Sequence, residues 1–169
     1  MNFVPLEQGL SAQDFAPFGG FIDRPGVIGD RRFYSDWLGA ARPDCAPVLH
    51  TNRIAPSECP VALDSLEHHP HAAQVFLPLD VSRYLVMVAP SDADGRPLIS
   101  ALRAFVMPGS LGVVYRPGIW HAGARVLDRE GSFAVLMWRG SQNDDVHLPI
   151  ARLLVGPDPE KAMVGGAHG

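Results

Sequence analysis

The sequence predicts an all-β fold, a jelly-roll type of β-barrel with one short helix near the N-terminus. Sixteen prolines and seventeen glycines divide the 169 residues into short segments. No apolar pattern with a period of 3.6 residues lasts long enough for a core helix. Many short strands bounded by turn residues are typical of β-sandwiches and barrels, and the jelly-roll barrel commonly encloses a small-molecule cavity.

The expected elements follow in order along the chain. Ser11 can cap a short helix, because Asp14 follows three residues later in the order of a capping box. In residues 18–43, glycine, arginine and acidic residues alternate with isolated aromatics, so we expect a loosely ordered loop with short strands, suited to a lid or a dimer contact. Residues 91–97 predict a turn between two paired strands. The predicted strands are residues 48–54, 73–79, 84–89, 98–107, 112–116, 125–127 and 133–138.

Length and composition favour a single domain over residues 1–169. A chain of this length buries a core without disulfides or a structural metal. Apolar residues make up 47% and charged residues 19% of the chain, close to the averages for globular proteins. We expect the barrel core at about residues 45–150 and a flexible tail at residues 156–169.

Charge and apolar patterning exclude several classes of partner. The net charge of −4 and the lack of basic clusters argue against nucleic acid. The longest apolar runs are far shorter than the roughly 20 residues needed to cross a bilayer. Cys45 and Cys59 lack CxxC spacing, which argues against a disulfide scaffold and a thiolate zinc site. Without a secretory pattern at the N-terminus, we expect a cytoplasmic protein that binds a small molecule.

Two segments carry residues suited to chemistry. Residues 66–76 contain three histidines, and strand alternation places Gln74 on the same face as Phe76. Residues 112–121 predict a strand, then a Pro-Gly turn, then His121. Imidazole nitrogens with amide or carboxylate oxygens suit nickel, zinc, manganese or iron, and the sequence does not choose among them. For His68 and His71, the alternative is an exposed loop position.

The charged residues near these segments leave alternatives open. Arg53 and Arg103 lie in predicted strands, where a buried charge needs an anionic partner. That partner is either an internal acid or the carboxylate of a bound substrate. Glu67 is the carboxylate nearest the histidines, and it can act as a base or fix His69 in one tautomer.

These segments together resemble the ureidoglycolate lyases, a family of the cupin superfamily. Members carry a stretch of roughly LERHPLGTQAFIP, and residues 66–78 here are LEHHPHAAQVFLP, which keeps Glu67, His69, Pro70, Gln74 and Phe76. Cupins commonly place a metal-ligand histidine after a turn like the one before His121. The further matches, within about residues 48–146, are Asn52-Arg53, Leu102-Arg103-Ala104-Phe105, Gly112-Val113 with Tyr115, Trp120-His121 and Arg139-Gly140-Ser141.

The resemblance implies a cupin-like double-stranded β-helix that cleaves ureidoglycolate to glyoxylate and urea, the closing step of allantoin and purine breakdown. It also implies a homodimer and stimulation by a divalent metal such as nickel, and no organic cofactor is expected. Arg103 is our first choice for holding the substrate carboxylate and Arg53 our second. The expected catalytic residues are Glu67, His69 and His121; the substrate-binding residues are Arg53, Arg103, Gln74, Tyr115 and Trp120; the metal ligands are His69, His71, Gln74 and His121.

The chain also departs from the family pattern. It has Tyr115-Arg116-Pro117 where the family usually has Tyr-His-Arg, His121-Ala122 where it has His-His, and Trp138 where it has Asp. Conversely, His68 and His71 replace an Arg and a Leu. Because fold does not determine function, two alternatives stay open: a metal-dependent cupin of another reaction class, such as an oxygenase or isomerase, and a non-catalytic sensor of a small acid.

Overall fold

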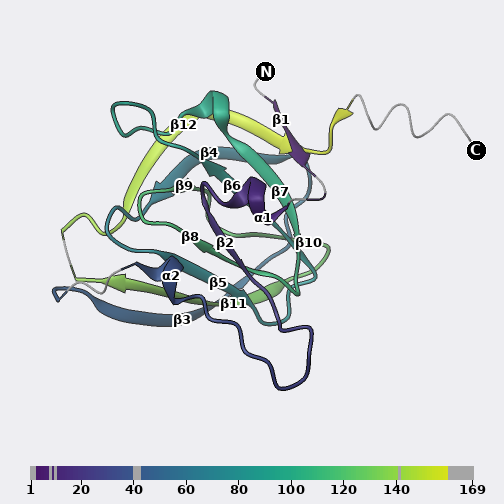
Figure 1. The fold of residues 1–169 in the computed structure, drawn as a ribbon. Coiled ribbons are helices and arrows are strands. Elements are labelled where there is room, and N and C mark those ends of the chain that lie inside the picture. Colours follow the sequence, from purple (N-terminus) through teal and green to yellow (C-terminus); the bar gives the residue numbers. More distant parts are fainter. Residues whose placement is uncertain (1–2, 8, 10, 40–42, 141, 160–169) are drawn as a thin grey trace, which may run out of the picture.

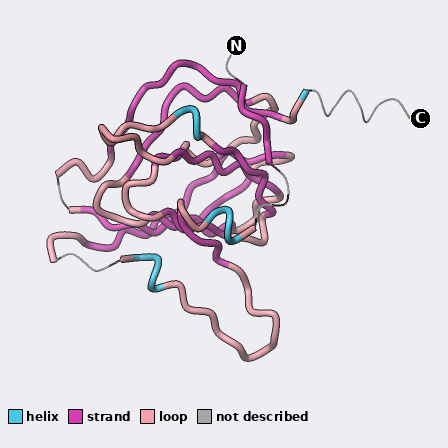
Figure 2. The backbone as a smooth tube through the Cα atoms, turned by 45° about the horizontal axis from the view of Figure 1, so that its top comes forward, coloured by secondary structure: helices cyan, strands magenta, loops and turns pink. Residues whose placement is uncertain are grey.

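The computed structural model describes residues 3–7, 9, 11–39, 43–140 and 142–159, and it shows two β-sheets that face each other (Figure 1). Strands make up most of the fold and the helices are short (Figure 2). Residues 160–169 of the predicted flexible tail lie outside the described part of the chain. The elements are β1 (Phe3–Glu7), α1 (Ala12–Phe15), β2 (Gly19–Ile22), α2 (Ser35–Leu38), β3 (Ala46–Ile54), β4 (Val61–His68), β5 (Gln74–Pro78), β6 (Arg83–Ala89), η1 (Ile99–Ala101), β7 (Arg103–Pro108), β8 (Gly112–Tyr115), β9 (Trp120–His121), β10 (Arg125–Leu127), β11 (Gly131–Arg139) and β12 (Val146–Gly156).

The strand order confirms the predicted all-β, cupin-like barrel. The larger sheet has seven strands in the order β10-β6-β7-β1-β12-β4-β9, and β9 also pairs with β6, so this sheet closes on itself. The smaller sheet has five strands in the order β2-β8-β5-β11-β3. Most pairings are antiparallel, but β1 runs parallel to both β7 and β12.

Strand β6 is buried on both faces, which explains its unbroken apolar sequence. Tyr84 and Val86 point into the core between the two sheets. Leu85 and Met87 point into a second core, enclosed by the larger sheet. Each such side chain contributes about 1.5–3 kcal/mol through the burial of its apolar surface. A strand with two buried faces needs no alternating polar residues.

The N-terminal segment confirms the predicted capped helix. Ser11 is the N-cap of α1, and its hydroxyl oxygen accepts a hydrogen bond from the backbone N–H of Asp14 at 3.1 Å. Phe15 is fully buried, and its ring stacks on Phe21 of β2 at 4.8 Å. Beyond β2, the segment that we predicted as a loop also contains α2, a second short helix. None of the helices in the described ranges is long and apolar enough to cross a membrane.

Some elements were not predicted, because their partners are distant in sequence. β1 lies between β7 and β12, and β4 pairs with β12, so the sheet decides their conformation. The predicted strand at residues 98–107 is partly wrong, because residues 99–101 form a 3-10 turn and the strand begins only at Arg103. The expected turn at residues 91–97 does join the paired strands β6 and β7, and Ser91 forms a β-bridge with Pro97.

Candidate active site

Four polar side chains from both sheets meet at one end of the barrel. Glu67 comes from β4, His121 from β9, Gln74 begins β5, and His69 lies in the loop between β4 and β5. The Nε2 atom of His121 is 2.8 Å from Oε1 of Gln74 and 3.5 Å from Oε1 of Glu67. The rings of His69 and His121 are 5.3 Å apart. The structure thus brings together His69, Gln74 and His121, three of the four residues that the sequence suggested as metal ligands.

The two segments that carry the histidines are joined directly. Glu67 and His121 are cross-strand partners of β4 and β9. The Pro-Gly turn before β9 places Gly118 at φ 77°, in the left-handed region that glycine adopts without strain. The N–H of Gly118 donates to the carbonyl oxygen of His69 at 2.8 Å. Backbone hydrogen bonding therefore fixes the distance between the two histidines.

Burial sets the charge states in this cluster. The exposed fractions are 4% for His69, 6% for Gln74 and 1% for His121. Burial lowers the pKa of His69, since desolvation penalises the charged ring, so this imidazole is neutral at neutral pH. The hydrogen bond from His121 lowers the pKa of Glu67, which stays ionised. An ionised carboxylate beside a neutral imidazole is suited to accepting a proton.

The arrangement of lone pairs favours a cation between these residues. Nδ1 of His121 donates to the carbonyl oxygen of Ile119 at 2.9 Å, and its Nε2 faces the oxygens of Gln74 and Glu67, so these oxygens share whatever cation lies at Nε2. Nε2 of His69 is buried and has no hydrogen-bond partner. Acceptors gather in this way around a proton or a metal ion.

The donor set therefore fits a divalent metal ion. Ligand atoms of Glu67, His69 and His121 all lie within 4.8 Å of one another. Imidazole nitrogens and carboxylate oxygens are ligands for zinc, nickel, iron and manganese. The group could hold such an ion, with the amide oxygen of Gln74 next to it.

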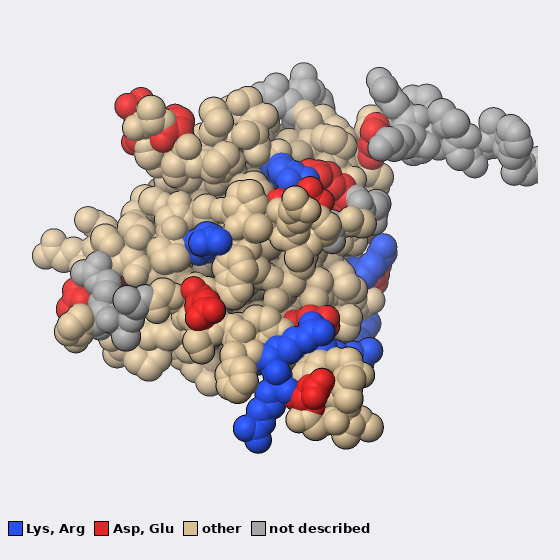
Figure 3. All heavy atoms as spheres, in the orientation of Figure 1, with Lys and Arg blue, Asp and Glu red and all other residues tan. Residues whose placement is uncertain are grey.

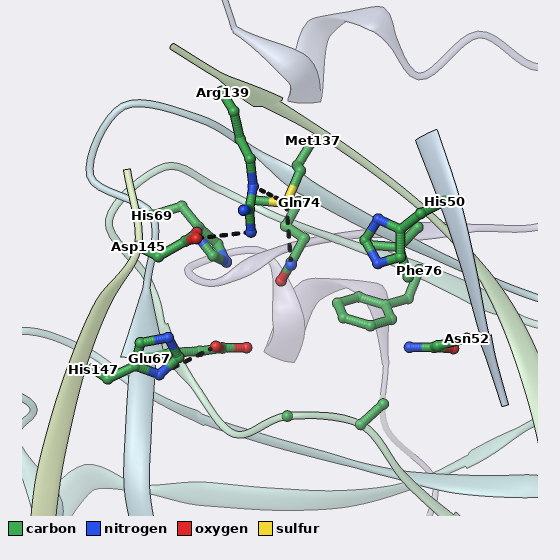
Figure 4. A pocket seen from close by; sticks show the side chains of 13 residues that line it. His50, Asn52, Glu67, His69, Gln74, Phe76, Met137, Arg139, Asp145 and His147 are labelled. Carbon is green, nitrogen blue, oxygen red and sulfur yellow. Dashed lines mark hydrogen bonds and ion pairs between the residues drawn. The ribbon is translucent and has the colours of Figure 1, made fainter. Parts of the chain in front are cut away.

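A cavity of about 210 Å³ opens beside this cluster (Figure 4). Phe76 and Val135 are apolar residues of its lining, and His50 and Asn52 of β3 border one end. His147 contributes Nδ1 at 3.5 Å from Oε2 of Glu67. The full lining is His50, Asn52, Glu67, His69, Gln74, Phe76, Gly123, Ala124, Val135, Met137, Arg139, Asp145 and His147.

Sequence reasoning missed a charged pair at the cavity. Asp145 Oδ2 lies 2.7 Å from Nη2 of Arg139, and Asp145 Oδ1 lies 2.9 Å from Nδ1 of His69. A signal for Arg139 was present, because strand alternation puts it on the same face of β11 as Val135 and Met137. No signal in the sequence marks three further lining residues, because they come from three separate elements. These are His50 of β3, His147 of β12 and Asp145 of the loop after β11.

The two arginines predicted to hold the substrate lie elsewhere, so those assignments are wrong. Arg103 donates to both carboxylate oxygens of Glu7, at 2.9 and 2.6 Å, and to the backbone oxygen of Asp14. Arg53 pairs with Glu130 on the surface. Neither lines the cavity. Arg53 is in register with Ser132 of β11, whereas its neighbour Asn52 faces the cavity.

Three further assignments also need correction. His71 is exposed and outside the donor group, so it is not a metal ligand. Tyr115 is buried, its ring stacks on His121 at 4.4 Å, and it does not line the cavity. Trp120 faces the second core, donates to the carbonyl oxygen of Gly95 at 3.0 Å and stacks on His68 at 3.9 Å.

The departures from the family pattern fall outside the cavity lining. Arg116, at the position of a family histidine, lies over the ring of Trp37 at 4.6 Å. Ala122, at the position of the second, is buried in the second core. Trp138 alternates with Met137 and Arg139 and faces the other side of β11. The donor group around His121 is therefore complete without these histidines.

Charged side chains of both signs are mixed on the face of the protein that Figure 3 shows. Blue Arg side chains gather in the lower part of this view, and red Asp and Glu side chains lie beside them.

Comparison with known proteins gives consistent matches. A family model described as "Ureidoglycolate lyase" matches residues 2–151. A ureidoglycolate lyase of Burkholderia cepacia is 35% identical over 152 residues, covering 83% of each chain, and one of Pseudomonas syringae pv. tomato is 32% identical, covering 90% of this chain and 95% of that protein. Among solved structures, RmlC from Streptococcus suis matches at TM-score 0.37 with 12% identity, covering 76% of this chain and 53% of that chain. An oxalate oxidase bound to glycolate matches at TM-score 0.38 with 19% identity, covering 76% and 69%.

Proposed function

The chain belongs to the ureidoglycolate lyase family, and we propose that it cleaves ureidoglycolate to glyoxylate and urea in the cavity beside Glu67, His69, Gln74 and His121. The observation that carries this proposal is the meeting of an ionised carboxylate, two buried imidazoles and an amide at that cavity. The cavity, about 210 Å³, suits a substrate of this small size.

The reaction needs one proton to move between two atoms of the substrate. A base removes the proton of the hydroxyl group, the C=O bond of glyoxylate forms, and the C–N bond breaks. The bond electrons pass to the urea nitrogen, which takes up a proton, so no net proton is consumed. General acid–base catalysis of this kind contributes on the order of 10²–10⁴ in rate.

Glu67 is the proposed base. Its pKa is lowered by His121, so it is ionised and ready to accept the hydroxyl proton. Its Oε1 faces His121 and its Oε2 faces His147, both within 3.5 Å. Once protonated, Glu67 can return the proton to the departing nitrogen. His69, neutral and buried, is the alternative base.

The metal-binding residues are proposed from the same geometry. His69 and His121 would hold a divalent ion such as nickel, zinc, manganese or iron, with the carboxylate of Glu67 and the amide oxygen of Gln74 facing it. Such an ion would polarise the hydroxyl and carboxylate groups of the substrate. Nδ1 of His69, 3.1 Å from the carbonyl oxygen of Asp144, keeps that ring oriented with Nε2 toward the cluster.

Release of urea from racemic ureidoglycolate tests the function directly. We expect one molecule of urea and one of glyoxylate per substrate cleaved, at a rate well above a protein-free control. Arg53→Gln is a matched control, because this arginine pairs with Glu130 outside the cavity. If purified protein with bound metal releases no urea, the proposed function is wrong.

Membership of the family also supports a proposal for the pathway in which the protein acts. The family reaction supports a role in allantoin and purine breakdown. A homodimer and a cytoplasmic location remain predictions, to be checked by light scattering of the purified protein and by cell fractionation.

A further inference from the structure

Arg139 has the position and charge needed to bind an anionic substrate. Among the residues that line the cavity, all within the described part of the chain, it alone has a permanently positive side chain. It ends the row of inward-facing residues on β11, after Val135 and Met137, and its Nε donates to the sulfur of Met137 at 3.4 Å. Figure 4 shows its guanidinium directed toward Gln74 and Asp145.

The charges around the cavity favour a cationic side chain at this position. Glu67 and Asp145 both contribute carboxylates to the lining, and His69 is neutral. A substrate carboxylate would meet two negative groups on entry. A guanidinium offers two parallel N–H donors in the geometry that matches a carboxylate.

In this structure a carboxylate of the protein already contacts that guanidinium. Asp145 Oδ2 is 2.7 Å from Nη2 of Arg139, and the side-chain exposure is 28% for Asp145 and 49% for Arg139. The other oxygen of Asp145, Oδ1, is buried, lies 2.9 Å from Nδ1 of His69 and makes no hydrogen bond. Asp145 thus lies between the guanidinium and the histidine, with its hydrogen bonding incomplete.

We propose that Arg139 binds the carboxylate of the substrate, and that Asp145 is a positioning residue that holds Arg139 in place and competes with the substrate carboxylate for it. This inference rests on the proposed function for the identity of the substrate. The substrate displaces Asp145 from Arg139, and the Asp145 carboxylate, whose Oδ1 already lies 2.9 Å from Nδ1 of His69, then shares the N–H of that ring with the carbonyl oxygen of Asp144. Binding and orientation of the histidine are coupled through one side chain.

The coupling predicts opposite effects on binding and turnover. Asp145→Asn removes the competing charge but keeps the shape, so we expect Arg139 to bind small carboxylates about three- to tenfold more tightly. The same variant loses the carboxylate beside His69, so kcat for urea release falls about tenfold or more. A residue with a merely structural role would weaken binding and turnover together. Arg139→Gln weakens carboxylate binding by about tenfold or more. Arg139→Lys keeps the positive charge but loses the paired N–H donors of the guanidinium, so its affinity lies between those of the parent and Arg139→Gln.

Isothermal titration with glycolate measures binding without turnover, because glycolate has the carboxylate and hydroxyl groups but no ureido group. The matched controls are Arg53→Gln and Glu130→Gln, which break a similar ion pair outside the cavity and leave the dissociation constant of glycolate unchanged. Thermal melting confirms that each variant is folded. Unchanged glycolate binding in Arg139→Gln overturns the role of Arg139, and weaker binding in Asp145→Asn overturns the role of Asp145.

The outcome separates this inference from the proposed function. If the parent protein releases no urea but binds glycolate in a manner that depends on Arg139, the reaction is wrong and the carboxylate site stands. If the parent releases urea and Arg139→Gln binds glycolate normally, the reaction stands and the inference is wrong.

Discussion

Glu67 and His121 face each other across strands β4 and β9, with their Cα atoms in register and Oε1 of Glu67 at 3.5 Å from Nε2 of His121. The pairing of β9 with β4 is also one of the contacts that close the larger sheet. The proposed base is therefore held by strand register, which is stiffer than a loop. The contacts that build the fold and those that build the site coincide here.

Replacing Glu67 by Gln tests its role as base. The change keeps the shape and removes the ability to accept a proton, so we expect kcat for urea release to fall about a hundredfold or more. Glu58→Gln, at an exposed glutamate, is the matched control. Metal content and melting temperature are measured for both variants, so that loss of the base is distinguished from loss of the metal or of the fold. Near-normal urea release by Glu67→Gln, with activity abolished in His69→Ala, would assign the base to His69 or to a metal-bound hydroxide.

Removal of metal tests the donor group around His121. We expect dialysis against a chelator to abolish urea release and a divalent ion to restore it, because two imidazoles and a carboxylate gather within 4.8 Å. Elemental analysis should show less bound metal in His69→Ala and His121→Ala, and an unchanged amount in His71→Ala, since His71 is exposed. Full activity of protein shown to be free of metal would contradict the metal site.

The sequence could predict those parts of the fold that depend on local pattern. The apolar run of β6, the capped helix at Ser11 and the Pro-Gly turn before His121 are each specified by neighbouring residues. Strands β1 and β12 could not be predicted in this way, because they are stabilised by pairing with strands that are distant in the chain: β1 with β7 and β12, and β12 with β4.

The site residues likewise divide into those that a local sequence pattern predicts and those that depend on distant contacts. Glu67, His69, Gln74 and His121 lie in two compact segments whose spacing is informative. Arg103 was chosen because a charge in a strand needs a partner, but its partner is Glu7, which reaches it through the parallel pairing of β1 with β7. Arg139 follows the same rule of alternation as Val135, but nothing in the sequence places Asp145 beside it.

Arg103→Gln should affect stability and leave catalysis unchanged. Arg103 is paired with Glu7, and the two side chains are 33% and 38% exposed, so solvent screening limits the pair to about 1 kcal/mol or less. The melting temperature should fall by up to about 4 °C for a chain of this size. We expect kcat and KM for ureidoglycolate within about twofold of the parent. A large rise in KM would show that Arg103 does bind the substrate.

Acid should remove the contribution of Asp128 to stability. Its hydrogen bonds from Arg83, at 2.8 Å from Nε, lower the pKa of the Asp128 carboxyl in the folded state. A lowered pKa stabilises the fold above the unfolded value of about 3.9, and this contribution is lost as the pH falls through the folded value. At pH 7 the melting temperature of the parent should therefore be higher than that of Asp128→Asn. In strong acid the two melting temperatures should be equal. A difference independent of pH would rule out the carboxylate's charge as its cause.

Gly118→Ala should damage both stability and catalysis. Gly118 has φ 77°, where a Cβ costs about 1–2 kcal/mol, and its N–H donates to the carbonyl oxygen of His69 at 2.8 Å. Gly29→Ala is the matched control, because Gly29 also has a positive φ, at 95°, and a Cβ added at either glycine meets no atom within 4 Å.

Both glycine variants should therefore melt several degrees below the parent. Only the Gly118 variant should lose kcat, because a distorted turn moves His121 relative to His69, and a shift of about 1 Å near reacting groups can cost on the order of a hundredfold. Urea release is measured at a temperature where circular dichroism shows every variant folded. Equal loss of activity in both variants would mean that reduced stability, and not the link between the two histidine segments, limits the reaction. Retained activity in Gly118→Ala would mean that the hydrogen bond to His69 survives the strain or is not needed.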